Sequence, residues 1–159
     1  MSKLLIAIDG SACSHRAVEY VARQFSGLSG LEVTLFHVLP YVPAVFWDDG
    51  HIKNSEEVEA RKKLVDLWLT NQTSRLEPIF RGATDILTRG GIRPEQITVR
   101  SVSDSIDTAG SIIEEARTGG YQTLVMGRCG RTAGERLLMG SVTTKVINYG
   151  AGMALCVVE

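Results

Sequence analysis

The chain has 159 residues, 44% of them hydrophobic, which suits one globular domain over residues 1–159 and leaves no room for a second. Its 17 Lys and Arg and 18 Asp and Glu give a net charge of -1, which excludes strong nonspecific attraction to nucleic acid or anionic membranes. The first apolar run, residues 4–8, is too short for a signal peptide or a spanning helix. We therefore expect a cytoplasmic protein.

The first strand is predicted over residues 3–8, a buried apolar run. A helix should follow, with Ser14 as its N-cap and Gly27 at its end, because apolar residues recur on one face at 18, 21, 22 and 25. Residues 31–38, rich in β-branched and apolar side chains, predict the second strand.

The middle of the chain predicts helix, strand and helix. Residues 56–72 and 79–87 carry helical apolar spacing, and Pro78 either starts a second helix or kinks one long helix. Residues 97–102 alternate as a strand, and Asp107 is the expected N-cap of the helix that follows.

The last third predicts a fourth strand around residues 124–126, a glycine-rich loop, a helix with Val142 and Val146 on its apolar side, and a final strand over residues 154–158. Strands that alternate with helices are typical of a parallel sheet. We expect an α/β, doubly wound, Rossmann-like sheet of five parallel strands in the order 3-2-1-4-5 with about four helices.

In such sheets, ligands lie beyond the carboxyl ends of the strands where the winding reverses. Here these are the first and fourth strands, so the crevice would hold Asp9 and Gly10 from one and the residues from Gly127 onward from the other. Asp9 could face a ligand there, or it could cap the first helix or bond the turn that follows. His37 is expected to be a packed strand histidine rather than a catalytic group.

The stretch after the fourth strand, "MGRCGRTAGERLLMGS" at residues 126–141, suits a phosphate. Glycines at 127 and 130 would let a ligand approach exposed backbone N–H groups, which form an anion nest. Gly140 and Ser141 fall where a helix begins, so free amides, the helix dipole and the Ser141 hydroxyl could converge on one phosphate. The chain must fold back between Gly130 and Gly140 to bring the two amide groups together. Nearby positive charge comes from Arg128, Arg131 and Arg136.

A plainer interpretation remains open, in which Gly127 and Gly130 only form a tight turn and Ser141 only caps a helix. Neither standard nucleotide motif is present. No Gly-Lys-Ser/Thr triplet of a phosphate-binding loop occurs, and the dinucleotide fingerprint is missing after the first strand.

The three cysteines, Cys13, Cys129 and Cys156, are an odd number without paired metal-ligand spacing. This pattern is typical of a reducing compartment, so we expect three free thiols. Cys129 stands between an arginine and a glycine in the expected anion site, so a redox role competes there with an incidental loop cysteine.

Over nearly all its length the chain resembles the nucleotide-binding branch of the universal stress protein family. The resemblance rests on "IAIDGS" at residues 6–11, "LFHV" at 35–38 and "MGRCGRTAGERLLMGSV" at 126–142. The last segment fits the family's ATP-binding pattern at every glycine and at the Gly-Ser pair.

The resemblance implies a role for each matching residue. Asp9 would face the nucleoside, the backbone of Val38 would bond the adenine edge, and Gly127 would lie against the ribose. The phosphates would be surrounded by Gly130, Gly140, Ser141 and the amide of Val142, beside the charge of Arg128. Mg or Mn is expected on the triphosphate oxygens.

The resemblance also implies a homodimer formed through the last strand, in a stress-response protein that binds ATP and regulates a protein partner. Hydrolysis would be slow at most, because only Asp9, Asp48 and Asp49 are candidate general bases near the crevice. Two alternatives remain: a dimeric interaction module that binds no nucleotide, and a nucleotide-hydrolysing enzyme.

Overall fold

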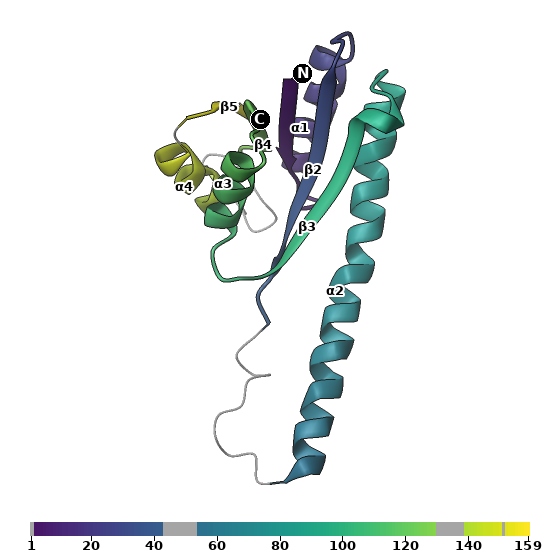
Figure 1. Ribbon diagram of the computed structural model, residues 1–159, viewed down its shortest axis with the longest axis vertical. Coiled ribbons are helices and arrows are strands. Elements are labelled where there is room, and N and C mark those ends of the chain that lie inside the picture. Colours follow the sequence, from purple (N-terminus) through teal and green to yellow (C-terminus); the bar gives the residue numbers. More distant parts are fainter. Residues whose placement is uncertain (1, 43–53, 130–138, 151) are drawn as a thin grey trace.

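The computed structural model describes residues 2–42, 54–129, 139–150 and 152–159. These residues form one parallel sheet with strand order β3-β2-β1-β4-β5, flanked by four α-helices (Figure 1). The predicted fold class and strand order are confirmed. The strands are β1 (Ser2–Ala7), β2 (Leu31–Pro40), β3 (Ile97–Ser105), β4 (Thr123–Gly127) and β5 (Ala154–Val158). The helices are α1 (Ala12–Phe25), α2 (Ser55–Arg89), α3 (Thr108–Thr118) and α4 (Ser141–Tyr149), with a short 3-10 helix, η2 (Pro94–Gln96), before β3.

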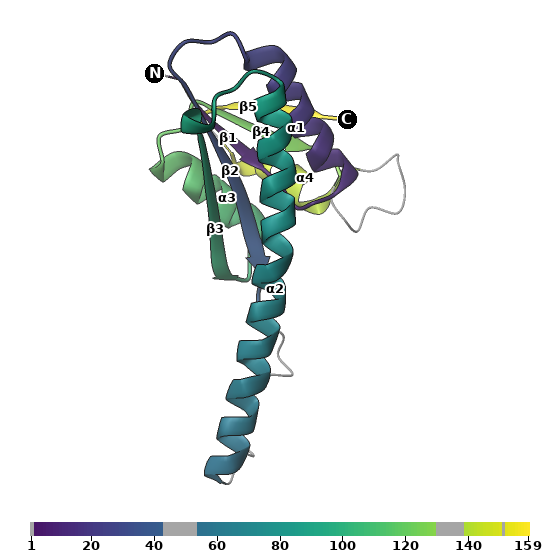
Figure 2. The same ribbon diagram turned by 90° about the vertical axis from the view of Figure 1, so that its right-hand side faces the viewer.

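Two apolar layers, one on each face of the sheet, hold the helices in place. Successive side chains of a strand point to opposite faces, so Leu4 and Ile6 pack with α1 and α2 while Leu5 and Ala7 pack with α3 and α4. Both faces are covered, which is why the strands read as nearly continuous apolar runs. Figure 2 shows α1 and α2 side by side on one face of the sheet.

The helix α2 is continuous and contains Pro78, so of the two expectations for this segment the single long helix is the one observed. Its C-terminal part reaches the core through Leu76, Ala83 and Leu87. Its N-terminal part extends away from the sheet (Figures 1 and 2).

The first helix begins earlier than predicted. Ser11, not Ser14, is its N-cap: the Ser11 side chain accepts from the Ser14 N–H at 3.2 Å, and Ser14 is buried. Gly10, at φ +78°, turns the chain directly after β1, so the helix can start at once. The helix ends at Phe25, short of Gly27. The predicted cap at Asp107 is confirmed, since its carboxylate accepts from the Gly110 N–H at 3.0 Å.

Throughout the described ranges, every helix is too short or too polar to span a membrane.

Candidate functional site

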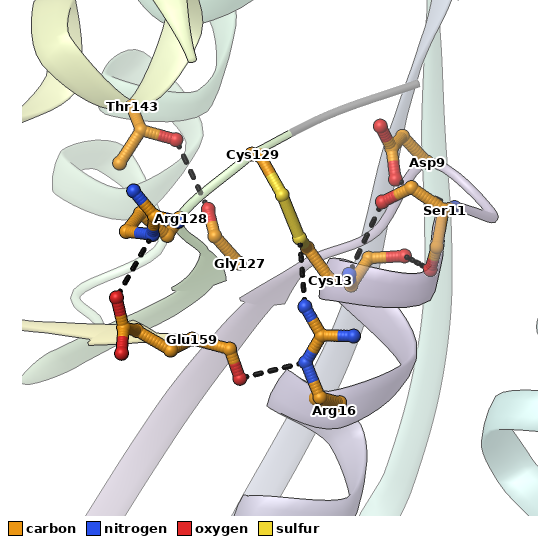
Figure 3. Close-up of a disulfide and its surroundings, with 10 residues drawn as sticks. Asp9, Ser11, Cys13, Arg16, Gly127, Arg128, Cys129, Thr143 and Glu159 are labelled. Carbon is orange, nitrogen blue, oxygen red and sulfur yellow. Dashed lines mark hydrogen bonds and ion pairs between the residues drawn. A yellow bond between two sulfur atoms is a disulfide. The ribbon is translucent and has the colours of Figure 1, made fainter. Parts of the chain in front are cut away.

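The carboxyl ends of β1 and β4 lie next to each other, as the ladder that pairs Ala7 with Met126 shows. β1 leads into Asp9 and Gly10, and β4 ends at Gly127. The structure therefore brings together the two chain segments that the sequence assigns to one crevice (Figure 3).

Gly127 is needed for a close approach between β4 and α1. A Cβ atom at this position would lie 2.6 Å from the backbone carbonyl carbon of Cys13 and 2.7 Å from its Cβ. Positive φ is found at Gly10 but not at Gly127. The missing side chain at Gly127 thus serves packing between two elements that both border the crevice.

Asp9 bonds the turn that follows it. Its Oδ1 accepts from the Ser11 N–H at 2.9 Å, one of the alternatives left open by the sequence. Asp9 is half-buried, and its carboxylate lies beside the first turn of α1 (Figure 3).

The backbone of Val38 faces the space beyond the end of β1. The Phe36 carbonyl accepts from the Ile8 N–H at 2.9 Å, so the backbone groups of Phe36 point toward β1. Backbone direction alternates along a strand, and Val38 therefore presents its N–H and C=O to the same side. The ladder between β1 and β2 stops at Ala7 and Phe36. The neighbouring His37 is buried, and its Nδ1 lies 2.7 Å from the Ile8 carbonyl oxygen, as suits a packed strand histidine.

The two ends of the glycine-rich loop meet, which confirms the expected return of the chain. The Gly140 N–H donates to the Arg128 carbonyl at 2.9 Å. The buried Thr143 hydroxyl of α4 donates to the Gly127 carbonyl at 3.0 Å. These two bonds hold the start of α4 against the end of β4. Gly130, Arg131 and Arg136, like Asp48 and Asp49, lie outside the described residues.

The start of α4 differs from the starts of the other three helices. Side chains cap α1, α2 and α3, from Ser11, Asn54 and Asp107. At α4 the N-cap is Gly140, which has no side chain to accept a capping hydrogen bond from the first turn. Ser141 is the first helical residue and not the cap. The amides of Ser141 and Val142 have no partner within the helix, because the first N–H groups of an α-helix never do.

Arg128 points toward the end of β5. Its Nε lies 3.1 Å from Glu159 Oε1, and its backbone N–H donates to the Val158 carbonyl at 2.8 Å. Figure 3 places the Arg128 and Glu159 side chains on the opposite side of the Cys13–Cys129 disulfide from Asp9. In this arrangement the guanidinium neutralises a carboxylate of the same chain.

A disulfide joins Cys13 and Cys129, so the expectation of three free thiols is wrong for these two residues. They are 116 residues apart in the chain, with Cα atoms 5.8 Å apart. Nothing in the spacing signals this pair, because only the neighbouring positions of β1 and β4 bring α1 to the loop. Cys156, on β5, is a free cysteine, and electrostatic repulsion between the ionised forms of the two side chains, together with their hydrogen bond, raises the pKa of Tyr20.

The described residues contain no cluster of three or more His, Cys, Asp or Glu side chains that could hold a metal ion. A divalent ion at this crevice would need most of its ligands from a phosphate group and water, as Mg²⁺ commonly does.

Comparison with known proteins places the chain in a family. The model of the universal stress protein family matches residues 1–157. The chain belongs to the universal stress protein family. A curated universal stress protein of Mycolicibacterium smegmatis is 29% identical over 159 residues, covering 97% of this chain and 47% of its own length. The chain thus spans about half the length of this relative.

Solved structures share the universal stress protein fold. A hypothetical protein, solved to assign its biochemical function, has a TM-score of 0.72 at 22% identity, covering 99% of this chain and 94% of its own. UspA of Lactobacillus plantarum has a TM-score of 0.68 at 16% identity, covering 99% and 97%. An Arabidopsis thaliana family member, solved with AMP bound, has a TM-score of 0.59 at 14% identity, covering 99% and 91%. Two further family structures hold cAMP and dAMP. At these identities the likeness shows the fold.

Proposed function

We propose that this chain binds an adenine nucleotide, with ATP as the expected ligand, in the crevice beyond β1 and β4. The observation that carries the proposal is the start of α4, where the N-cap is Gly140 and no side chain of the cap residue is present. The Gly140 N–H donates to the Arg128 carbonyl, which holds this helix start beside the end of β4. Amides without helical partners, together with the helix dipole, favour an anion. The phosphates would lie against the amides of Ser141 and Val142.

The other end of the nucleotide would lie at β2. The Val38 backbone offers a donor and an acceptor beyond the end of β1, the arrangement that an adenine edge requires. Family structures with AMP, cAMP and dAMP support the adenine assignment. Gly127 would lie against the ribose and Asp9 near the nucleoside. Gly130 would complete the phosphate nest, and Mg²⁺ or Mn²⁺ would neutralise the phosphate oxygens.

The cellular role follows from the family. We propose a cytoplasmic regulatory protein of the stress response, a homodimer through the outer edge of β5, which is an edge strand of the sheet. Its nucleotide occupancy would control contacts with a protein partner. Among the described residues, Asp9 is the one candidate general base for hydrolysis. Its carboxylate accepts from the Ser11 amide, so hydrolysis would be slow at most.

Calorimetric titration with MgATP tests the site, with Gly140→Val as the decisive variant. Gly140 has φ -60° and ψ 148°, angles open to any residue, so valine fits the backbone while its side chain enters the phosphate position. We expect the variant to lose binding. Gly27→Val is the matched control, because a Cβ at Gly27 meets nothing within 4 Å.

Nucleotide released by acid precipitation of the purified protein provides an independent measurement. Unchanged MgATP affinity in Gly140→Val would place the nucleotide elsewhere. No calorimetric signal and no co-purified nucleotide would overturn the proposal and favour an interaction module that binds no nucleotide.

A further inference from the structure

The Cys13–Cys129 disulfide spans the two segments that border the crevice. Cys13 lies in the first turn of α1, and Cys129 is two residues beyond β4 (Figure 3). We propose that this pair is a reversible thiol–disulfide exchange site, and that its oxidised form restricts nucleotide access to the crevice. The second part rests on the nucleotide function proposed above.

The two sulfur atoms have different surroundings, which sets the direction of exchange. Cys13 is buried, with 4% of its surface exposed, whereas Cys129 is only partly buried. An incoming thiolate therefore reaches the Cys129 sulfur first. The Cys13 sulfur becomes the leaving group.

The surroundings of Cys13 suit a departing thiolate. The Arg16 Nη2 donates to Cys13 Sγ at 3.0 Å, and Arg16 Nε is held by the Glu159 carbonyl at 2.7 Å. Cys13 also lies in the first turn of a 14-residue helix, whose positive end favours a negative charge. A fixed guanidinium and a helix N-terminus are the features that stabilise reactive thiolates. Asp9, the nearby carboxylate, is engaged with the Ser11 amide.

The reductant is a low-molecular-weight thiol, RSH, and the chemistry balances in two steps. The thiolate RS⁻ attacks Cys129 Sγ, the bond between the two cysteines breaks, and its electron pair remains on Cys13 Sγ beside Arg16. A second RS⁻ attacks the R sulfur of the mixed disulfide, releasing RSSR and the Cys129 thiolate. The two protons that the RSH molecules lose are taken up by the sulfur atoms of Cys13 and Cys129, which become the two thiols of the reduced protein. The protein gains two electrons, two RSH become RSSR, and oxidation by RSSR is the reverse.

The covalent bond affects the ligand because of where it lies. It fixes the Cα atoms of residues 13 and 129 at 5.8 Å, directly between the Asp9 turn and the end of β4 (Figure 3). Gly127 is already packed against Cys13, so the bond ties Cys129, as well as the end of β4, to the first turn of α1. We expect the reduced protein to bind MgATP about tenfold more tightly than the oxidised protein.

Coupling of this kind is reciprocal. If reduction tightens nucleotide binding tenfold, saturating MgATP must shift the dithiol–disulfide equilibrium tenfold toward the dithiol. For a two-electron couple this tenfold shift raises the reduction potential of the Cys13–Cys129 pair by about 30 mV.

The exchange site is tested first, without nucleotide, in Cys156→Ser protein equilibrated with mixtures of reduced and oxidised glutathione. Alkylation of the free thiols followed by mass spectrometry of the intact protein gives the fraction of protein that carries the disulfide. We expect a reversible transition, shifted about tenfold toward the disulfide in Arg16→Ala, with Arg16→Lys closer to the parent. Arg23→Ala, at the far end of α1, is the matched control and should not shift. Absence of a disulfide under oxidised glutathione, or equal shifts in the Arg16 and Arg23 variants, would overturn the exchange site.

The control of the crevice is tested by titrating MgATP into the oxidised and the reduced protein. Cys129→Ser should bind MgATP with the affinity of the reduced form, and treatment with oxidant should not change that affinity. Equal affinities, or tighter binding by the oxidised form, would overturn the control. Failure of both forms to bind MgATP would overturn the proposed function and the control together, while the glutathione titration still decides the exchange site.

Discussion

Gly127 lies so close to Cys13 that a single added methyl group would overlap the Cys13 backbone at 2.6 Å. This contact fixes the end of β4 against the first turn of α1, and both elements border the candidate site.

Gly127→Ala should therefore destabilise the fold. The new Cβ meets backbone atoms, which cannot rotate away, so α1 and β4 must separate. We expect a loss of about 1 to 3 kcal/mol in the free energy of unfolding, measured by urea denaturation. Gly27→Ala, whose Cβ would meet nothing within 4 Å, is the control and should change stability little. A stable Gly127→Ala protein would contradict the close approach.

The hydroxyl of Thr143 should stabilise the junction between α4 and β4. Thr143→Val keeps the shape of the side chain but removes its buried bond to the Gly127 carbonyl. The expected cost is about 1 kcal/mol in thermal or urea unfolding. In the exposed Thr144, the hydroxyl only bonds the Gly140 carbonyl within its own helix, so Thr144→Val should be nearly neutral. Equal effects of the two substitutions would argue against the Thr143 bond.

Gly82, within α2, and Gly90, directly after it, should respond in opposite directions to substitution by alanine. At Gly90, the cap of the helix, a Cβ would lie 2.6 Å from the Ala22 Cβ and 3.1 Å from its carbonyl oxygen, so Gly90→Ala should force α1 and α2 apart and lower the unfolding midpoint. Within the helix, Gly82 has nothing within 4 Å of its would-be Cβ. Gly82→Ala should stabilise by about 0.5 to 1 kcal/mol, because alanine is the better helix former. A lower midpoint for Gly82→Ala would contradict this.

Asp107 should contribute to the acid dependence of stability. The Lys145 ammonium, 2.6 Å from Asp107 Oδ2, holds the pKa of this carboxyl below its usual 3.8, and the Gly110 amide adds to the effect. Because the folded pKa is depressed, the stabilisation is present above the unfolded pKa and is lost as pH falls through the folded one.

Asp107→Asn keeps the cap of α3 but removes the charge. Its unfolding midpoint should fall less steeply than that of the parent between about pH 5 and pH 3, when followed by circular dichroism in both proteins. Identical slopes would show that the Lys145 contact does not shift the titration.

Much of the architecture could be predicted from the sequence, because its determinants are local. Apolar runs such as residues 31–38, separated by helical patterns, predict the parallel sheet, and Asp107 predicts the start of α3. The glycine motif predicts that the chain returns to the end of β4, and the bond from Gly140 to Arg128 confirms this.

Local patterns misplaced features that depend on neighbours in space. Ser14 and Ser11 are equally good caps by type, but the turn at Gly10 decides for Ser11. The pairing of Arg128 with Glu159, which follows β5, likewise has no local signal, while the predicted role of Arg128 beside a phosphate stays a prediction.

By itself, the sequence determined the family, the order of helices and strands and the segments that border the crevice, since these follow from hydrophobic periodicity and glycine placement along the chain. Only the tertiary structure decided that Cys13 meets Cys129 and that α4 begins without a capping side chain beside β4. The reason is physical: such contacts join residues far apart in the chain, and their geometry is set by the pairing of β1 with β4 and by packing between layers, neither of which leaves a local signal.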